Sequence, residues 1–257
     1  MAATGEGARW QGRNETKDGL RHAVWSDLET SGAGVGPVRS RIPDYVGAEA
    51  AAERLATLKA WRDAAIVKCN PDPPQIPVRR KALEAGKRLY APVPELVKPF
   101  PFVLLDPDAL ARRGIAFADA ARSEVFVEVG EPVRFQEMRP MDLIVVGSVA
   151  VTRAGGRTGK GGGFADLELG IFRELGLVRP STPIVTTVHG LQVVDRERLV
   201  IEAHDSALDW IATPDELIET RTAHPQPRGV DWARVCPDQF ADIPFLAELR
   251  AEIEARG

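Results

Sequence analysis

The amino-acid sequence predicts an α/β fold in which a mostly parallel sheet carries helices on both faces. Two observations predict it. From residue 46 onwards, short apolar segments alternate with amphipathic segments of helical length. The segment DLIVVGSVAV (142–151) is apolar at odd and even positions alike, which is typical of a central parallel strand buried on both faces. The expected architecture is therefore three layers, with the sheet between two layers of helices.

The elements follow in chain order. Residues 1–16 are polar and rich in glycine, which predicts a disordered tail. A helix is expected over 17–30, where Leu20, Val24 and Leu28 recur at helical spacing. Residues 17–257 are expected to form a single domain. Further helices are expected over 47–61, 78–86, 164–176 and 243–256, and extended segments over 64–70, 88–94, 102–107, 142–151, 183–194 and 209–214.

Composition excludes several classes of protein. Lys plus Arg number 33 and Asp plus Glu number 37 in 257 residues, and the chain has no basic run, so nucleic acid is not an expected partner. Two cysteines, Cys69 and Cys236, are too few for a disulfide framework. With no apolar run of membrane-spanning length and no apolar core of a signal peptide, the chain is expected to be cytoplasmic, free of membranes and active on a small molecule.

One loop carries a candidate binding site. Between residues 155 and 163, six of the nine residues are glycine, and a helix is expected to begin at Phe164. Glycine lets backbone N–H groups approach a ligand closely, and a helix N-terminus adds N–H donors and partial positive charge. Arg157 and Lys160 add full charges. The segment predicts a cradle for nucleotide phosphates, although a flexible surface connection is also rich in glycine.

The loop differs from the two common phosphate-binding motifs. A P-loop requires glycine where this chain has Ala154, and Ser or Thr where it has Gly161. A dinucleotide-binding loop starting at Gly159 would need glycine in place of Phe164. Asp166, in the first turn of the expected helix, is either a partner of the helix dipole or a ligand for Mg²⁺ bound to phosphates.

The segment 142–170 resembles the signature of the 5-formyltetrahydrofolate cyclo-ligase family, also called methenyltetrahydrofolate synthetases. KDGLR (17–21) is similar to the family's N-terminal K-x-x-L-R element, and AHDSALDWIATP (203–214) to its C-terminal H-D element. The segments 41–55, 67–94 and 182–195 resemble one branch, the methenyltetrahydrofolate synthetase domain-containing paralogues. Within 142–170, the signature residues are Arg157, Gly159, Gly161, Gly163, Phe164 and Asp166.

The resemblance implies a Rossmann-like, cyclo-ligase or NagB-type fold with ATP and Mg²⁺ as cofactors. It implies catalytic roles for Arg157 and Lys160, and a metal-binding role for Asp166. It also places the ATP phosphates on Lys17, Arg21, Gly159, Gly161, Gly162, Gly163 and Phe164, and substrate on His204 and Asp205. Taken alone, Lys17 and Arg21 would be a solvated basic helix end. Arg79 and Arg80 either hold an acidic substrate tail or form a solvated helix face.

The resemblance leaves three functions open. The first is conversion of 5-formyltetrahydrofolate to 5,10-methenyltetrahydrofolate, in which the formyl oxygen is phosphorylated by ATP and then displaced. The second is the same chemistry on another formamide or amide, such as one of thiamin-type metabolism, because Ala165 replaces a second aromatic residue and PPQIPVRR (73–80) replaces an acidic and hydroxyl pair of the cyclo-ligases. The third is a non-catalytic nucleotide-binding protein.

Overall fold

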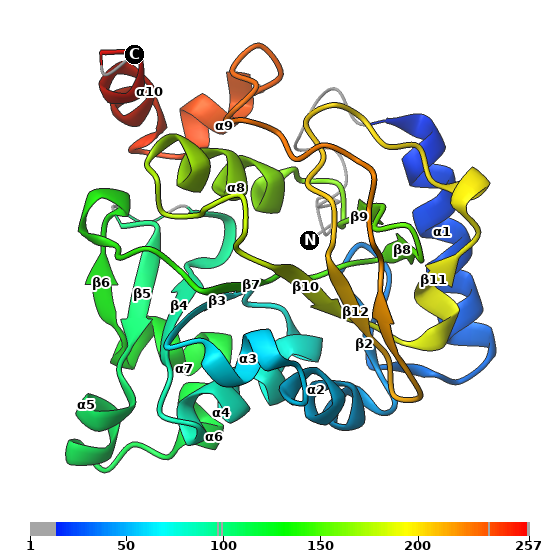
Figure 1. Ribbon diagram of the computed structural model, residues 1–257, viewed down its shortest axis with the longest axis horizontal. Helices are drawn as coiled ribbons and strands as arrows, with labels where there is room; N and C mark the ends of the chain where they lie inside the picture. Colours follow the sequence, from blue (N-terminus) through cyan, green and yellow to red (C-terminus); the bar gives the residue numbers. More distant parts are fainter. Residues whose placement is uncertain (1–13, 97, 99, 236, 256–257) are drawn as a thin grey trace, which may run out of the picture.

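The computed structural model describes residues 14–255, apart from Val97, Pro99 and Cys236. In this part of the chain, eight strands form one sheet in the order β13-β12-β10-β7-β3-β4-β5-β6 (Figure 1). Neighbours from β12 to β4 are parallel, and the outer pairs are antiparallel. The strands are β3 (Ile66–Cys69), β4 (Arg88–Pro92), β5 (Phe102–Leu105), β6 (Glu131–Val133), β7 (Leu143–Val145), β10 (Ile184–Thr187), β12 (Trp210–Ala212) and β13 (Leu217–Glu219).

Helices cover both faces of this sheet, so the predicted α/β class with a mostly parallel sheet is confirmed (Figure 1). One face carries α2 (Ala48–Ala56), α3 (Lys59–Asp63), α4 (Ile76–Glu84), α6 (Phe117–Ala120) and α7 (Ser123–Val129), with α5 (Pro107–Arg112) beside them; the other carries α8 (Phe164–Glu174), α9 (Pro237–Asp242) and α10 (Leu246–Glu254).

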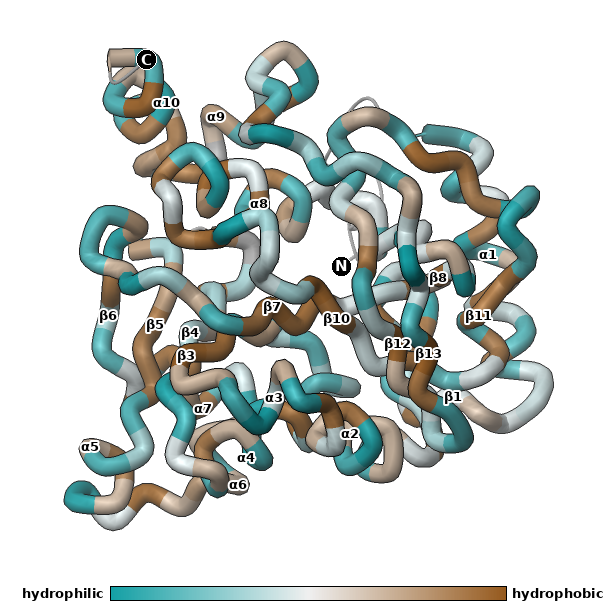
Figure 2. The backbone as a smooth tube through the Cα atoms, viewed as in Figure 1, coloured by the Kyte–Doolittle hydropathy of each residue, from teal (hydrophilic) through white to brown (hydrophobic). Residues whose placement is uncertain are grey.

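The central strands separate two hydrophobic cores. Leu143 and Val145 of β7 belong to the core under α2 and α4, whereas Ile144 belongs to the core under α8. Successive side chains of a strand point to opposite faces, so an apolar residue is required at every position. In Figure 2 the backbone of β7 and β10, in the middle of the sheet, has the colour of hydrophobic residues.

The apolar segment 142–151 is not the one strand that the sequence predicts. It forms β7 and then β8 (Ala150–Thr152), which pairs with β9 (Arg157–Thr158) and β11 (Val193–Val194) in a second, small sheet. Residues 146–149 join the two strands, with a bend at Val149, and a Cβ atom at Gly147 would lie 2.7 Å from the Asp72 carboxylate. Residues from the bend onwards are apolar because they enter a third core, so hydropathy alone hides the bend.

The helix α1 (Glu15–Thr30) packs its buried Leu20, Val24 and Leu28 on this third core. It begins two residues before the expected start, because the Asn14 side chain accepts a hydrogen bond from the Lys17 backbone N–H at 3.0 Å and caps the helix. The prediction of a disordered tail is therefore wrong for residues 14–16. Residues 1–13 lie outside the described part of the chain.

The expected C-terminal helix 243–256 begins later and is shorter. Residue 244 is proline, which lacks a backbone N–H, and the chain forms α9 before it and α10 after it. The remaining elements are β1 (Gly34–Val35), paired with β2 (Asp44–Tyr45), and 3-10 helices at Pro73–Gln75, Pro94–Leu96, Phe135–Glu137, Gly190–Gln192 and Arg196–Arg198. Within the described ranges, none of the helices has the length and apolar character needed to span a bilayer.

Candidate functional site

A cavity of about 520 Å³ opens where the parallel strands β3 and β7 end. Asn70 and Asp72 follow β3, and Gly147 follows β7. In open α/β sheets, ligands bind at the carboxyl ends of the strands. The rest of the wall comes from segments far apart in sequence: Asn14, Lys17, Arg21, Ile42, the run 157–167, Glu202, His204, Asp205, Gly229, Val230, Asp231, Ala233, Arg234, Val235, Pro237 and Gln239.

Residues 157–163 of the predicted glycine loop form one side of this cavity. Gly155 and Gly156 instead lie between β8 and β9, and residues 159–163 lead from β9 into α8, which begins at Phe164 as expected. Gly161 and Gly163 have φ values of +110° and +70°, which residues with a Cβ rarely adopt. Because residues 163–167 line the cavity, the N-terminus of the eleven-residue helix α8 faces it with N–H groups and a partial positive charge.

Arg157 is held rigidly beside the loop. Its Nη1 donates to the Gly147 carbonyl at 3.0 Å, and its Nη2 lies 2.6 Å from the Asp166 carboxylate. The other carboxylate oxygen of Asp166 accepts from the backbone N–H of Ser206 at 2.9 Å. Asp166 thus orients a buried arginine toward the cavity, and its metal-binding role remains a prediction.

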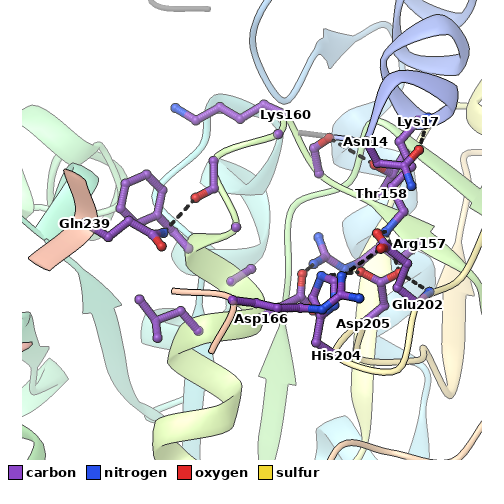
Figure 3. A pocket seen from close by; sticks show the side chains of 18 of the residues that line it. Asn14, Lys17, Arg157, Thr158, Lys160, Asp166, Glu202, His204, Asp205 and Gln239 are labelled. Carbon is purple, nitrogen blue, oxygen red and sulfur yellow. Dashed lines mark hydrogen bonds and ion pairs between the residues drawn. The ribbon is translucent and has the colours of Figure 1, made fainter. Parts of the chain in front are cut away.

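The helix α1 brings two more cations to the loop. Arg21 donates from Nε to the Gly159 carbonyl at 2.7 Å and from Nη2 to the Thr158 hydroxyl at 2.8 Å. The Nζ of Lys17 lies 2.5 Å from Asp205 and 3.0 Å from Glu202. Both cations are buried, so the interpretation of a solvated helix end is wrong. Lys17 thus contacts an acidic group that contains Glu202 and Asp205, and Figure 3 shows these three residues on one side of the cavity.

That acidic group was only partly foreseen. Glu202, His204 and Asp205 bring one ligand atom each to within 4.8 Å of one another, and Glu202 was missed although it lies two residues before the expected histidine. Carboxylate oxygens suit Mg²⁺, but Lys17 already places a positive charge between the two carboxylates. The group is a candidate cation site, and its carboxylates would be free to bind a metal ion only if the Lys17 side chain moved away.

The pKa of Glu202 predicts a pH dependence of stability. Burial by itself would raise this pKa, but hydrogen bonds from Arg234 and Lys17 outweigh it and lower the pKa from 4.5 to about 2. A carboxyl group whose pKa is lower in the folded than in the unfolded state stabilises the fold fully when the pH is above the pKa of the unfolded state. This stabilisation is lost as the pH falls toward the pKa of the folded state. We expect the wild-type advantage over Glu202→Gln in urea unfolding to be constant above pH 5 and to shrink toward pH 2. A difference that stays constant over that range would contradict the assignment.

Two arginines predicted for substrate lie elsewhere. Arg79 is fully buried, donates to the carbonyls of Ala121 at 2.7 Å and Asp72 at 3.1 Å, and packs over the Phe126 ring. Arg80 pairs with Glu49 on the helix surface. Neither lines the cavity, so the structure does not bring them together with the other predicted site residues, and their contact with substrate stays a prediction. Arg79 instead fixes the turn after β3, because the main chain there has carbonyls that need donors.

The same turn holds a residue that sequence reasoning missed. Asp72 lines the cavity, and burial raises its pKa, opposed by the charges of Lys160 and Arg79. Beneath it, Lys68 of β3 forms a buried ion pair with Glu168 of α8 at 2.6 Å. The available signal was a carboxylate three residues after the end of a buried strand, but the sequence NPDPP is equally typical of a simple strand end.

Most predicted site residues therefore meet at one cavity. Its wall includes Lys17, Arg21, Arg157, Gly159, Lys160, Gly161, Gly162, Gly163, Phe164, Asp166, His204 and Asp205. They come from three segments that are more than 100 residues apart at the extremes, and only the fold brings them together. Their roles toward ATP, metal and substrate remain predictions.

Comparison with known proteins agrees with the resemblance. The methenyltetrahydrofolate synthase domain-containing proteins of Bos taurus and Danio rerio are each 36% identical to the chain, over 94% and 93% of its length, and the Homo sapiens protein is 34% identical over 94%. The chain spans 62–64% of these relatives. An NMR structure of Aquifex aeolicus 5,10-methenyltetrahydrofolate synthetase aligns with a TM-score of 0.48 and 21% identity, covering 82% of this chain and 94% of that one. The profile of the 5-formyltetrahydrofolate cyclo-ligase family matches residues 13–214, and the chain belongs to that family.

Proposed function

We propose that this protein is an ATP-dependent enzyme that phosphorylates a formamide oxygen, as in the conversion of 5-formyltetrahydrofolate to 5,10-methenyltetrahydrofolate. One observation carries the proposal. The N-terminus of α8 and its glycine loop face a cavity onto which α1 and β9 direct buried cations. Such an arrangement supplies N–H donors and positive charge, which are the requirements of phosphoryl transfer.

In the proposed reaction, the formyl oxygen attacks the γ-phosphorus of ATP and ADP departs. Nitrogen N10 then attacks the activated carbon, inorganic phosphate leaves, and the N10 proton is released. Phosphorylation converts a poor leaving group into a good one. The residues of this chain position the reactants and stabilise charge. Arg157 is already oriented by Asp166 and Gly147 for this purpose.

Magnesium fits the acidic groups of the cavity. Bound Mg²⁺ would neutralise charge on the phosphate oxygens. Asp166 is the proposed ligand at the helix N-terminus, and the carboxylates of Glu202 and Asp205 offer further oxygen donors. Because Asp166 also pairs with Arg157, binding of the cation would have to share or replace that contact.

A second candidate substrate is a smaller formamide or amide. It is favoured by the placement of Arg79 and Arg80, since neither of the arginines expected for an acidic tail lines the cavity. An assay of ATP turnover against a panel of formamides, with 5-formyltetrahydrofolate first, separates the two substrates. Nucleotide binding without turnover of any member would favour a non-catalytic protein and would contradict the proposal.

Substitution in the loop tests the phosphate site. We expect Gly161→Val and Gly163→Val each to abolish the binding of ATP with Mg²⁺ that calorimetry measures. A positive φ is unfavourable for valine at both positions, and its branched side chain would obstruct the backbone N–H groups. Gly176→Val, which also removes a glycine of positive φ, is the matched control at the other end of α8, and it should bind ATP as the wild type does. Equal affinity in all three variants would remove the loop from the site.

A further inference from the structure

We infer that the C-terminal segment beyond the family match is part of the binding site, and that Gln239 is a positioning residue for the glycine loop. The inference rests on the proposed function for its ligand, ATP. The family profile ends at residue 214, yet one side of the cavity is built after it. We call this side the C-terminal wall; it consists of Gly229, Val230, Asp231, Ala233, Arg234, Val235, Pro237 and Gln239.

The C-terminal wall is closely fitted to α8. A Cβ on Gly229 would lie 1.8 Å from the Glu174 carboxylate, and a Cβ on Gly170 would lie 3.0 Å from the Gly229 carbonyl. The backbone N–H of Val230 donates to Glu174 at 3.3 Å. At Gly170 the nearby atoms include backbone of Gly229 and Val230, so a side chain there has no room and the segment packs closely on the helix. At Gly229 a side chain would displace the Glu174 carboxylate. The wall therefore has a defined position relative to the helix that begins at the loop.

The wall reaches the phosphate-binding elements through two polar side chains. Gln239 is 6% exposed, and its Nε2 donates to the Gly162 carbonyl at 3.2 Å. Arg234 donates to the Glu202 carboxylate at 2.8 Å, and the same carboxylate binds Lys17. Figure 3 shows Gln239 on the side of the cavity opposite Lys17 and Glu202. The wall thus contacts the glycine loop directly and reaches Lys17 through Glu202.

The contact of Gln239 has a direct consequence for the loop. Gly162 lies between the two glycines of positive φ, and such glycines have wide conformational freedom. A hydrogen bond to the Gly162 carbonyl fixes the orientation of that peptide group, and with it the N–H of Gly163 at the start of α8. An anion is bound well only when such donors already converge. Gln239 therefore preorganises the loop for phosphate, although it lies outside the family's motifs.

Hydrogen exchange together with calorimetry tests this inference. In Gln239→Ala, we expect the amides of residues 159–163 to exchange about tenfold faster and the dissociation constant for ATP with Mg²⁺ to rise about tenfold, as loss of one buried hydrogen bond predicts. Gln239→Glu keeps the shape, removes the donor and adds a negative charge beside the phosphates, so the loss of affinity should be greater. Gln136→Ala is the control, because Gln136 also bonds the C-terminal region, at Glu252, but does not line the cavity.

The outcomes are distinct. Faster exchange confined to the loop, with core amides of β7 and β10 unchanged, and weaker ATP binding would support the inference, whereas general acceleration would reveal a merely structural role and overturn it. Unchanged loop exchange in Gln239→Ala, or faster exchange with unaltered ATP affinity, would also overturn it. If the wild-type protein itself binds no ATP, the proposed function fails, and the exchange of the loop still decides whether Gln239 holds it.

Discussion

Replacing Lys160 by alanine is expected to lower turnover of ATP with its formamide substrate by about 10²-fold. Removal of one oriented charge or donor that acts on the transition state typically has an effect of that size. Lys160 lies in the glycine loop at the wall of the cavity, and its charge acts on Asp72. Its side chain is exposed, so truncation should leave the free energy of unfolding nearly unchanged.

The measurement is steady-state turnover together with a denaturant titration. Lys59→Ala is the matched control, because Lys59 is a surface lysine on α3 with an 80% exposed side chain. It should retain wild-type turnover. A loss in Lys160→Ala that appears only in KM would show that the lysine contributes equally to binding and to the transition state. Wild-type turnover in Lys160→Ala would exclude the proposed catalytic role.

The second large effect is expected on stability. Lys68→Met should lower the free energy of unfolding by about 3–5 kcal/mol, because removal of one partner leaves a buried charge without compensation. Lys68 is 0% and Glu168 4% exposed in the pair that joins β3 to α8. Burial raises the pKa of Glu168, and Lys68 opposes that shift. Without the lysine, the pKa of this carboxyl group should therefore rise further, which favours its protonated form.

A double-mutant cycle separates the pair from its surroundings. Lys68→Met combined with Glu168→Leu should recover much of the lost stability, because replacement of a whole buried ion pair by apolar residues is often neutral. Lys59→Met removes a surface ion pair with Asp63 and should change unfolding little, since exposed pairs are screened. Additive losses at positions 68 and 168 would contradict a direct interaction. Since α8 follows the glycine loop, Lys68→Met should also weaken ATP binding.

Sequence reasoning succeeded where a single local cause dominates. The start of α8 at Phe164 follows from the glycines before it, and the burial of β7 on both faces follows from its unbroken apolar composition. It failed at 142–151, where residues 146–149 join two buried strands of different sheets. Both halves are apolar for the same energetic reason, and nothing in the pattern records that they enter different cores.

The roles of charged residues show the same division. Arg79 and Arg80 are adjacent in sequence, but one is fully buried beneath the turn after β3 and the other lies on the surface of α4. The charge pattern offered a solvated helix face for both residues, which fits Arg80 but does not indicate the burial of Arg79. Gln239 gave no signal at all, because a single glutamine near the C-terminus belongs to no motif, and its contact with Gly162 depends on how the chain returns across α8.

By itself the sequence determined the α/β class and the family, and it predicted phosphate binding at the glycine loop, because each depends on residues close together in the chain. Apolar periodicity is fixed by burial, and positive φ and close approach are fixed by glycine. Only the tertiary structure decided which charges converge. It placed Lys17 on Glu202 and Asp205, set Asp166 against Arg157, and brought the C-terminal wall over the loop. Those contacts join distant segments, and their geometry follows from the packing of the whole fold, which no local pattern encodes.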